Sequence, residues 1–409
     1  MELKKIHISD IGKVVTGKTP RTSIVENYGG DIPFLTPSDD LSYKSVPKTG
    51  KTLTEQGLNE VKNCLLPPHS VCVSCIGTDL GKVVMTSEPT ITNQQFNSII
   101  PNRRFDADFV YYLMTLVGKE LNYLSKTSTA VPIINKSSFS NYEVEVPDLE
   151  TQEKIASILS SLDSKIELNR RINDNLEQQA QALFKSWFVD FEPFRDDEFI
   201  DSELGKIPKG WEIGTIEDLC QNIASGSTPS SMNQEYYNGE IKWFTTKELK
   251  DSFLIDSEKH ISDEGHKNSS TKMFPRGTVL MAIYAAPTVG RLGILTSDAT
   301  FNQAAVGLNP KQEIGSNYVF LLLKKERDNF NNLAIGAAQQ NLSVKFVKTY
   351  PIIIPSKKVI VDFNVLVNPF FDRISLLSKE IEALTGTRDT LLPKLMSGKL
   401  RISEIEKEK

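Results

Sequence analysis

Two stretches of the chain carry seam positions at alternating steps of four and three residues. This spacing is the 3.5-residue period of a coiled-coil helix, in which the repeated positions line one face. The first seam consists of Ile155, Leu159, Leu162, Ile166, Asn169, Asn173, Leu176, Ala180, Leu183 and Trp187. The second consists of Phe363, Val367, Phe370, Ile374, Leu377, Ile381, Leu384, Arg388, Leu391 and Leu395. We therefore predict two long helices, over residues 150–190 and 356–400.

The two seams have equal length, so the simplest arrangement packs one helix against the other. Because globular sequence separates them, the two helices can run antiparallel. Asn169 and Asn173 would then lie inside the seam, where buried amides lower stability but can fix the register of a coiled coil. In the alternative arrangement, each helix packs only on the surface of its own globular unit.

Outside the seams, the pattern predicts two globular α/β units, residues 1–149 and 208–355, in a protein of the α+β class. Short apolar runs bounded by glycine predict strands, and runs with a period of 3.6 predict helices. In the first unit, strand, turn, strand and helix are expected at Val71–Ile76, Gly77–Gly81, Lys82–Met85 and Asp108–Met114. In the second unit, strand, turn and helix are expected at Val279–Ile283, Ala286–Gly290 and Tyr318–Leu323. Residues 191–207 are predicted to form an acidic, irregular linker, and 401–409 a charged tail.

The two units repeat each other at a nearly constant offset of 209 residues, the separation of Gly17 and Gly226. The segment Gly17–Pro20 returns as Gly226–Pro229, and the pair Asn93-Gln94 returns as Asn302-Gln303. The spacing is kept while most side chains change. We therefore predict two copies of one fold in a pseudo-twofold arrangement, with two different surfaces joined by the two helices.

Composition is ordinary for a globular protein, with 39% hydrophobic and 24% charged residues among 409. The chain has no run of 18 apolar residues and no apolar segment at its start, so we expect neither a membrane span nor a secretory signal. Four cysteines favour a reducing cytoplasm over a disulfide framework. The net charge of -5 argues against binding nucleic acid through the overall field of the chain. A local basic cleft, or partners that carry positive charge, would remove that objection.

Several segments resemble conserved parts of one family. Gln152–Phe194, QEKIASILSSLDSKIELNRRINDNLEQQAQALFKSWFVDFEPF, resembles the central conserved region of type I restriction-modification specificity subunits. Ser202–Glu212 (SELGKIPKGWE) is similar to the segment that opens their second half, and Leu391–Leu400 (LLPKLMSGKL) to the end of their distal conserved helix. Gly17–Pro20 with Tyr28–Asp40 (YGGDIPFLTPSDD) resembles the start of a target recognition domain. The resemblance covers essentially the whole chain.

This resemblance implies that each globular unit is a target recognition domain for one half of a bipartite, asymmetric DNA sequence. It implies that the paired helices set the gap between the half-sites and dock two modification (methyltransferase) subunits, and with them the restriction subunits. A predicted helix of about 38 residues would be about 57 Å long, whereas one turn of DNA is about 34–36 Å. The family's specificity subunit is not catalytic. S-adenosylmethionine, ATP and Mg²⁺ are accordingly expected on the partners and not on this chain.

Other functions have less support in the sequence. There is no Asn-Pro-Pro-Tyr/Phe methyltransferase motif, because Asn309-Pro310 and Asn368-Pro369 lack a second proline. There is no complete phosphate-binding loop, because Gly77–Val83 has three residues between its glycines and ends in valine. A self-sufficient methyltransferase is therefore the weakest hypothesis. The alternative that stays open is a non-catalytic coiled-coil adaptor with protein-binding globular domains.

A cluster of Cys64, His69, Cys72 and Cys75 has the density of a zinc site. Residues three apart on a strand point to opposite faces, however, so the thiols of Cys72 and Cys75 should diverge. The repeat places apolar Leu280 and Ile283 at the positions of these two cysteines. We therefore predict that they are small core side chains and that the chain has no metal site.

The repeat also separates scaffold positions from candidate DNA-binding positions. Glycines, prolines and asparagines shared by both units are expected to maintain turns. Loop positions that differ in hydrogen-bonding character are candidates to read base edges in the major groove: Lys18/Ser227, Ser38/Lys247 and Asp79/Thr288. Shared donors are candidates for phosphate contacts, or alternatively for ordinary turn and surface roles: Lys82/Arg291, Thr19/Thr228 and Thr36/Thr245. Gln339 and Gln340 belong to an amide-rich loop that could bind adenine.

Overall fold

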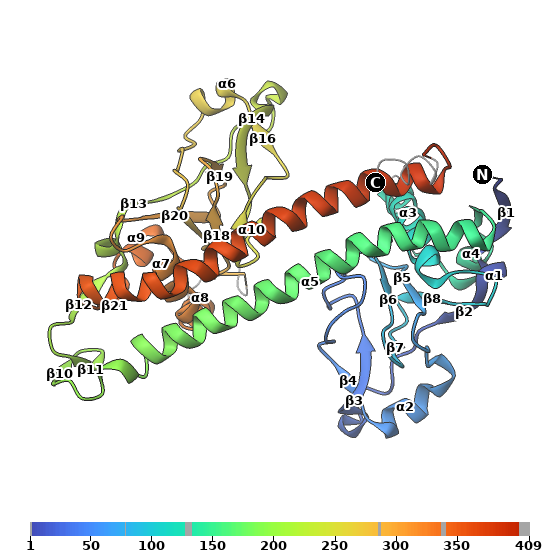
Figure 1. The fold of residues 1–409 in the computed structure, drawn as a ribbon, viewed down its shortest axis with the longest axis horizontal. Coiled ribbons are helices and arrows are strands. Elements are labelled where there is room, and N and C mark those ends of the chain that lie inside the picture. Colours follow the sequence, from blue (N-terminus) through green and yellow to red (C-terminus); the bar gives the residue numbers. More distant parts are fainter. Residues whose placement is uncertain (1, 78, 127–132, 285–287, 337–340, 401–409) are drawn as a thin grey trace. The chain divides into compact units, whose positions relative to one another are not determined.

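The computed structural model describes residues 2–77, 79–126, 133–284, 288–336 and 341–400, and Figure 1 shows its ribbon. The chain forms two compact units. One contains residues up to Glu167 and those from Ala383 onward, and the other runs from Leu168 to Glu382. Each unit therefore combines one globular domain with part of each long helix, whereas the predicted segmentation treated each helix as a segment of its own.

The first unit contains two small sheets. The main, antiparallel sheet has the order β2 (Gly12–Thr16), β8 (Phe96–Pro101), β5 (Val71–Ser74) and β6 (Val83–Met85). The second sheet has the order β4 (Thr52–Leu53), β3 (Tyr28–Leu35) and β7 (Ile91–Thr92). A separate antiparallel pair joins β1 (Lys4–His7) to β9 (Glu143–Val146). The domain's helices are α1 (Ile8–Ile11), α2 (Glu55–Val61), α3 (Ala107–Lys126) and α4 (Lys136–Ser140).

The second unit repeats this plan. Its main sheet has the order β13 (Cys220–Ser225), β20 (Ala305–Pro310), β17 (Val279–Ala282), β18 (Leu292–Leu295) and β15 (Ser252–Leu254). The smaller sheet has the order β16 (His260–Ile261), β14 (Tyr237–Phe244) and β19 (Thr300–Phe301). The separate pair joins β12 (Glu212–Thr215) to β21 (Pro351–Ile354). Its helices are α6 (Asp263–Lys267), α7 (Ser316–Lys325), α8 (Arg327–Gly336) and α9 (Val344–Lys348).

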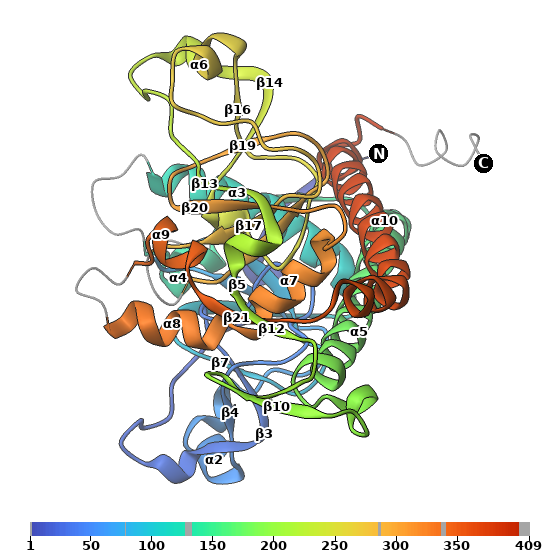
Figure 2. The ribbon, with the colours of Figure 1, turned by 90° about the vertical axis from the view of Figure 1, so that its left-hand side faces the viewer.

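In both units the smaller sheet carries a short helix at its outer end. Figures 1 and 2 show α6 beside β14 and β16 in the second unit, and α2 beside β3 and β4 in the first. The N-terminal turn of each short helix is capped in the same way: the hydroxyl of Thr54 accepts from Gly57 N–H, and that of Ser262 accepts from Gly265 N–H. The duplication predicted from spacing therefore extends to the local hydrogen bonds that begin these helices.

The predicted long helices are α5 (Leu149–Phe188) and α10 (Lys357–Met396), each 40 residues long. All twenty predicted seam positions are buried or half-buried. Within the second unit, Asn169 donates to Glu380 at 2.9 Å and Asn173 donates to Ser378 at 3.3 Å. A later residue of α5 thus contacts an earlier residue of α10. The two helices are therefore antiparallel, as predicted.

Each long helix also packs on the globular domains. In the first unit, Ile155 and Leu159 of α5 share a core with Leu392 and Leu395 of α10 and with the apolar side of α3. In the second unit, Phe184 and Phe188 of α5 and Phe363 of α10 join a core with Tyr318 of α7. The alternative in which each helix packs only on its own domain is therefore wrong, because both helices contribute to both cores and contact each other.

One local prediction was wrong. Residues 191–207, predicted to be irregular, contain an antiparallel hairpin of β10 (Phe199–Ser202) and β11 (Gly205–Pro208). Gly205 has a φ of +102°, and this tight turn allows the acidic segment to pair with itself. The helix predicted at Tyr318–Leu323 is present as part of α7. The two units differ at this point, because α7 ends before Glu326 and α8 begins at Arg327, whereas α3 of the first unit is continuous. Glu326 is buried and bound to Lys325, Asn329 and Tyr350, contacts that hold the chain at the break.

Candidate nucleic-acid interface

Two repeated motifs that lie far apart in the sequence meet in each unit. The hydroxyl of Thr19 donates to Oε1 of Gln94 at 2.6 Å, and that of Thr228 donates to Oε1 of Gln303 at 2.5 Å. A close backbone approach makes this junction possible, because a Cβ added to Gly17 would lie 2.1 Å from the carbonyl oxygen of Asn93. The two predicted threonine candidates therefore take part in internal hydrogen bonds of the scaffold.

The second pair of threonine candidates closes a turn. Thr36 donates to the carboxylate of Asp39 through its backbone N–H at 2.7 Å and its hydroxyl at 3.1 Å. Thr245 forms the equivalent bonds with Glu248, at 2.7 and 2.8 Å. The turns hold two exposed residues of different chemistry at the same position, Ser38 and Lys247. The pair was predicted to read different base edges, and two exposed side chains of different chemistry on the same turn suit that role.

The turn between the central strands is followed by a basic residue in both units. Lys82 and Arg291 are exposed, while Asp79 and Thr288 are half-buried. The carbonyl of Asp79 accepts from the Ser74 hydroxyl at 2.6 Å, and the Thr288 hydroxyl donates to Tyr284 O at 2.8 Å. The two units thus keep a basic residue at the end of the turn and fix its preceding residues by different local bonds. Gln339 and Gln340 lie outside the residues that the structure describes.

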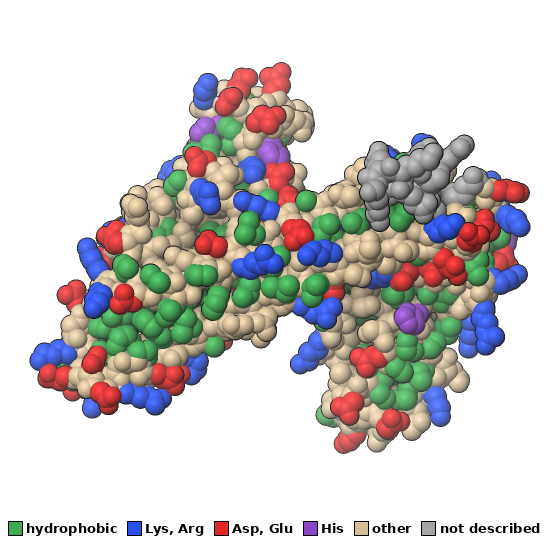
Figure 3. Space-filling model, in the orientation of Figure 1, with side chains coloured by type: hydrophobic (Ala, Val, Ile, Leu, Met, Phe, Trp, Pro, Cys, Tyr) green, Lys and Arg blue, Asp and Glu red, His purple; other side chains and the backbone are tan. Residues whose placement is uncertain are grey.

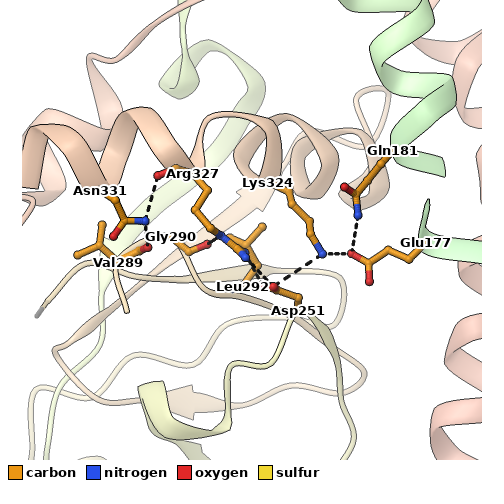
Figure 4. Close-up of polar contacts among 9 residues, drawn as sticks. All are labelled: Glu177, Gln181, Asp251, Val289, Gly290, Leu292, Lys324, Arg327 and Asn331. Carbon is orange, nitrogen blue, oxygen red and sulfur yellow. Dashed lines mark hydrogen bonds and ion pairs between the residues drawn. The ribbon is translucent and has the colours of Figure 1, made fainter. Parts of the chain in front are cut away.

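In the second unit, a charged network holds this turn (Figure 4). Arg327 donates to Gly290 O at 2.8 Å and pairs with the carboxylate of Asp251, which also accepts from Leu292 N–H at 2.9 Å. Lys324 lies 3.7 Å from Asp251 and forms an ion pair with Glu177 of α5. The network therefore links the long helix to the turn that carries Thr288 and Arg291.

The two acids of this network have pKa values shifted in opposite directions. Burial raises the pKa of Glu177, against the opposing effect of Lys324. Burial would also raise the pKa of Asp251, but the hydrogen bonds from Arg327 and the charges of Lys324 and Arg327 lower it below its usual value. Asp251 is therefore the acid that the native network stabilises in its ionised form.

The first unit has small residues at the corresponding positions. At the 209-residue offset, Ser42, Thr115 and Gly118 replace Asp251, Lys324 and Arg327. Without an arginine side chain, the turn approaches α3 directly: a Cβ on Gly118 would lie 2.1 Å from Gly81 O. A cavity of about 390 Å³ lies beside this contact. Charged side chains therefore support the turn in one unit, and backbone packing supports it in the other.

Between the long helices, a second polar cluster lies in the first unit. Asp163 of α5 accepts from the buried Tyr112 hydroxyl at 2.5 Å and from Arg388 of α10 at 2.8 Å. Burial, followed by the charge of Asp163, raises the pKa of Tyr112, which keeps it a neutral donor. The cluster joins α3, α5 and α10, and it explains why the predicted apolar seam contains an arginine.

The remaining sequence candidates are parts of the core. Cys72 of β5 and Cys75, which follows β5, belong to different hydrophobic clusters, and burial raises the pKa of Cys72 to about 12. Trp187 and Phe188 contact Phe363 in the core of the second unit. In the part of the chain that the structure describes, no helix is long and apolar enough to cross a bilayer.

Comparison with known proteins identifies the family. The family model described as the type I restriction modification DNA specificity domain matches residues 1–178 and 208–385. The chain belongs to this specificity family. The recognition made from the sequence motifs is thus confirmed, and so is the prediction that the domain occurs twice.

Individual members of the specificity family match over most of their length. The type I restriction enzyme MjaIX specificity subunit of Methanocaldococcus jannaschii is 31% identical, over 99% of this chain and 94% of that protein. The HindI specificity subunit of Haemophilus influenzae is 28% identical, over 80% and 83% of the two chains. The crystal structure of an S subunit from M. genitalium has the same fold, with a TM-score of 0.53 and 17% identity over 97% of this chain and 96% of that one.

In this specificity subunit, some positions of interest had no signal in local sequence. Gln94 and Gln303 are marked in the sequence only by the repetition of the Asn-Gln pair. Asn122 and Asn331 lie at the same 209-residue offset and bind the turn, but no local motif indicates this role. In both pairs, the identity of a polar residue at this offset is the sequence signal for the shared role.

Proposed function

We propose that each globular domain of this specificity subunit reads one half of a bipartite, asymmetric DNA site. The observation that carries the proposal is that the specificity-domain model matches twice, on two domains with the same hydrogen-bonded turns but different exposed side chains. Contacts to phosphates position a protein on DNA, and contacts to base edges provide the specificity. Two readers of different half-sites need a common scaffold and different exposed donors, as at Ser38 and Lys247.

The two long helices would set the gap between the half-sites and dock the partner subunits. A helix of 40 residues is about 60 Å long. Figure 3 shows apolar side chains gathered over the ends of the long helices in the second unit. On α10, four large apolar residues are 45–67% exposed: Val361, Val365, Leu366 and Leu376. Exposed apolar surface of this kind suits burial against helices of a partner.

We propose two modification (methyltransferase) subunits as these partners, with restriction subunits joining through them. S-adenosylmethionine, ATP and Mg²⁺ would bind to the partners, and this chain would contribute recognition without catalysis. Partners with positive charge would also offset the net charge of -5 during DNA binding in the cytoplasm. The adaptor hypothesis is not favoured, because both of its supposed protein-binding domains match a DNA specificity domain.

Domain exchange tests the proposal. Residues 1–149 would be replaced by the corresponding domain of another specificity subunit, and the methylome of cells that carry the hybrid and its modification partner would be sequenced. We expect one half-site to change while the other half-site is kept. The reciprocal exchange of 208–355 is the matched control and should change the other half-site. If either exchange changes both half-sites, the proposal of two independent readers is wrong.

A further inference from the structure

Gln94 and Gln303 occupy the same position in the two domains and are oriented by the same bond. Their Oε1 atoms accept from the hydroxyls of Thr19 and Thr228. Both glutamine side chains are exposed. Because the carbonyl end of each amide is used, its Nε2 amino group faces away from the threonine. This amino group has two protons and no hydrogen-bond partner among the described residues.

The backbone around each glutamine is fixed. In the first domain, Lys18 N–H donates to Thr92 O at 2.9 Å. In the second, Ser227 N–H donates to Phe301 O at 2.9 Å, and a Cβ on Gly226 would lie 2.1 Å from that same carbonyl oxygen. The loop and the turn are therefore locked together, and the amide is held in place before any ligand arrives. A donor oriented in advance loses little conformational entropy on binding.

We propose that the Nε2 groups of Gln94 and Gln303 each donate a hydrogen bond to a phosphate of the DNA backbone. This inference rests on the proposed function. A residue that is identical and identically oriented in two domains with different half-sites cannot discriminate between those half-sites. Phosphate is the DNA group that both half-sites share, and contacts with it fix the position of a domain on the duplex.

The neighbouring side chains fit such a contact. Lys18, next to Thr19, is exposed and forms no ion pair with a residue that the structure describes. In the second domain its place is taken by Ser227, which is bound to Ser270 at 2.6 Å. The amide is thus the donor that both sites share, whereas the lysine adds charge to one site only. Neutral amide donors also suit a chain whose net charge is -5.

The alternative is that the threonine–glutamine bond only fastens the loop to the turn. The substitution Gln94→Glu separates the two roles, because a carboxylate still accepts from Thr19 but cannot donate and repels phosphate. Gln94→Lys makes the opposite change, since an ammonium group donates to phosphate but cannot accept from Thr19. The matched control is Gln56→Glu, which makes the same charge change at an exposed position of α2.

The experiment uses the specificity subunit in complex with co-expressed modification subunits. Binding to a duplex with the methylome-defined site and to an unrelated duplex is measured for each variant, together with thermal unfolding. Hydrogen bonds to charged groups are worth about 1.5–3 kcal/mol. We therefore expect Gln94→Glu and Gln303→Glu to lower the affinity of the complex for both duplexes roughly ten- to a hundredfold. We expect Gln94→Lys and Gln56→Glu to bind like the parent, and the melting temperature of Gln94→Glu to be unchanged. A neutral methylphosphonate at one linkage of the duplex should largely remove the effect of Gln94→Glu.

Three results would overturn the inference alone while leaving the proposed function intact. One is parental affinity in both glutamate variants. Another is a loss confined to the specific duplex, which would indicate a base contact. The third is that Gln94→Lys loses as much affinity for DNA as Gln94→Glu and also has a lower melting temperature than the parent. That result would indicate that the threonine–glutamine bond only fastens the loop to the turn. If the parent complex itself shows no preference for its methylated site, the proposed function fails, and this inference fails with it.

Discussion

Asn122 and Asn331 donate hydrogen bonds to equivalent backbone carbonyl groups in the two copies of the domain. Asn122 Nδ2 donates to Leu80 O at 2.7 Å, and Asn331 Nδ2 donates to Val289 O at 2.9 Å. Each accepting residue immediately precedes the glycine of the turn, Gly81 or Gly290, which has a φ above +80° in both units. A helical amide therefore fixes the turn in each unit, although different side chains surround it.

We predict that Asn331→Ala loosens the turn of the second domain and Asn122→Ala that of the first. Loss of a hydrogen bond to a buried carbonyl should lower the free energy of unfolding by about 1–2 kcal/mol. Each variant is tested by competition between two altered duplexes. A duplex altered in the half-site of the unchanged domain still depends on the substituted domain, so its binding should be weakened more. A duplex altered in the half-site of the substituted domain should be affected less. The control Asn332→Ala removes an exposed amide one residue further along α8 and should have no effect. Equal loss at both half-sites would contradict a local role.

Asp251 and Glu177 should give the second domain opposite pH dependences. The pKa of Asp251 is lowered in the native state, so its contribution to stability is present above the unfolded-state pKa, near 3.8, and is lost as pH falls through the lower native value. The pKa of Glu177 is raised, so its contribution is present below its unfolded-state pKa, near 4.5, and is lost as pH rises through the native value.

Asp251→Asn should therefore flatten the loss of stability at the acid end, and Glu177→Gln should flatten the loss between weakly acidic and neutral pH. Urea unfolding from pH 3 to 7, followed by the fluorescence of the tryptophans, would measure both effects. The two substitutions act on one network through Lys324, so parallel changes in the two pH profiles would show that the assigned signs are wrong.

The contact between Gly81 and Gly118 should tolerate no side chain. Gly118→Ala places a Cβ 2.1 Å from Gly81 O, so the turn must move away from α3. We expect a loss of about 1–3 kcal/mol in the free energy of unfolding. Gly386→Ala is the matched control: it also lies within a long helix, but its Cβ would meet no atom within 4 Å. That substitution should raise stability by about 1 kcal/mol through helix propensity. Thermal unfolding of both variants would compare them, and a stable Gly118→Ala variant would contradict the close approach.

Periodic features were predictable because they repeat a local rule many times. The seam from Ile155 to Trp187 repeats the same spacing over ten positions. Polar residues at two of these positions, Asn169 and Asn173, therefore do not obscure the prediction of a helix. The duplicated turns were predictable for the same reason, because glycine positions such as Gly81 and Gly290 survive when side chains change. Spacing alone could also separate the faces occupied by Cys72 and Cys75.

Contacts between distant segments were not predictable in this way. Thr19 and Gln94 are 75 residues apart, and Asp251 and Arg327 are 76 apart, so no local pattern links them. The break in the helix at Glu326 depends on a partner, Tyr350, that is remote in sequence. For the threonine candidates, the sequence offered both phosphate contact and turn closure; the structure shows the closure bonds, and contact with DNA stays a prediction.

The spacer role of the helices can be tested by lengthening them in register. Insertion of one heptad in α5 after Asn173, together with one in α10 opposite it after Ser378, keeps the seam continuous because seven residues return the same face. The insertion adds about 10 Å to each helix, or roughly three base pairs at 3.4 Å each. We expect the methylome to show the same two half-sites with a gap about three base pairs longer. Insertion of two residues at the same points rotates the seam out of phase and should abolish modification. Modified sites with an unchanged gap in the heptad variant would show that the helices do not set the spacing.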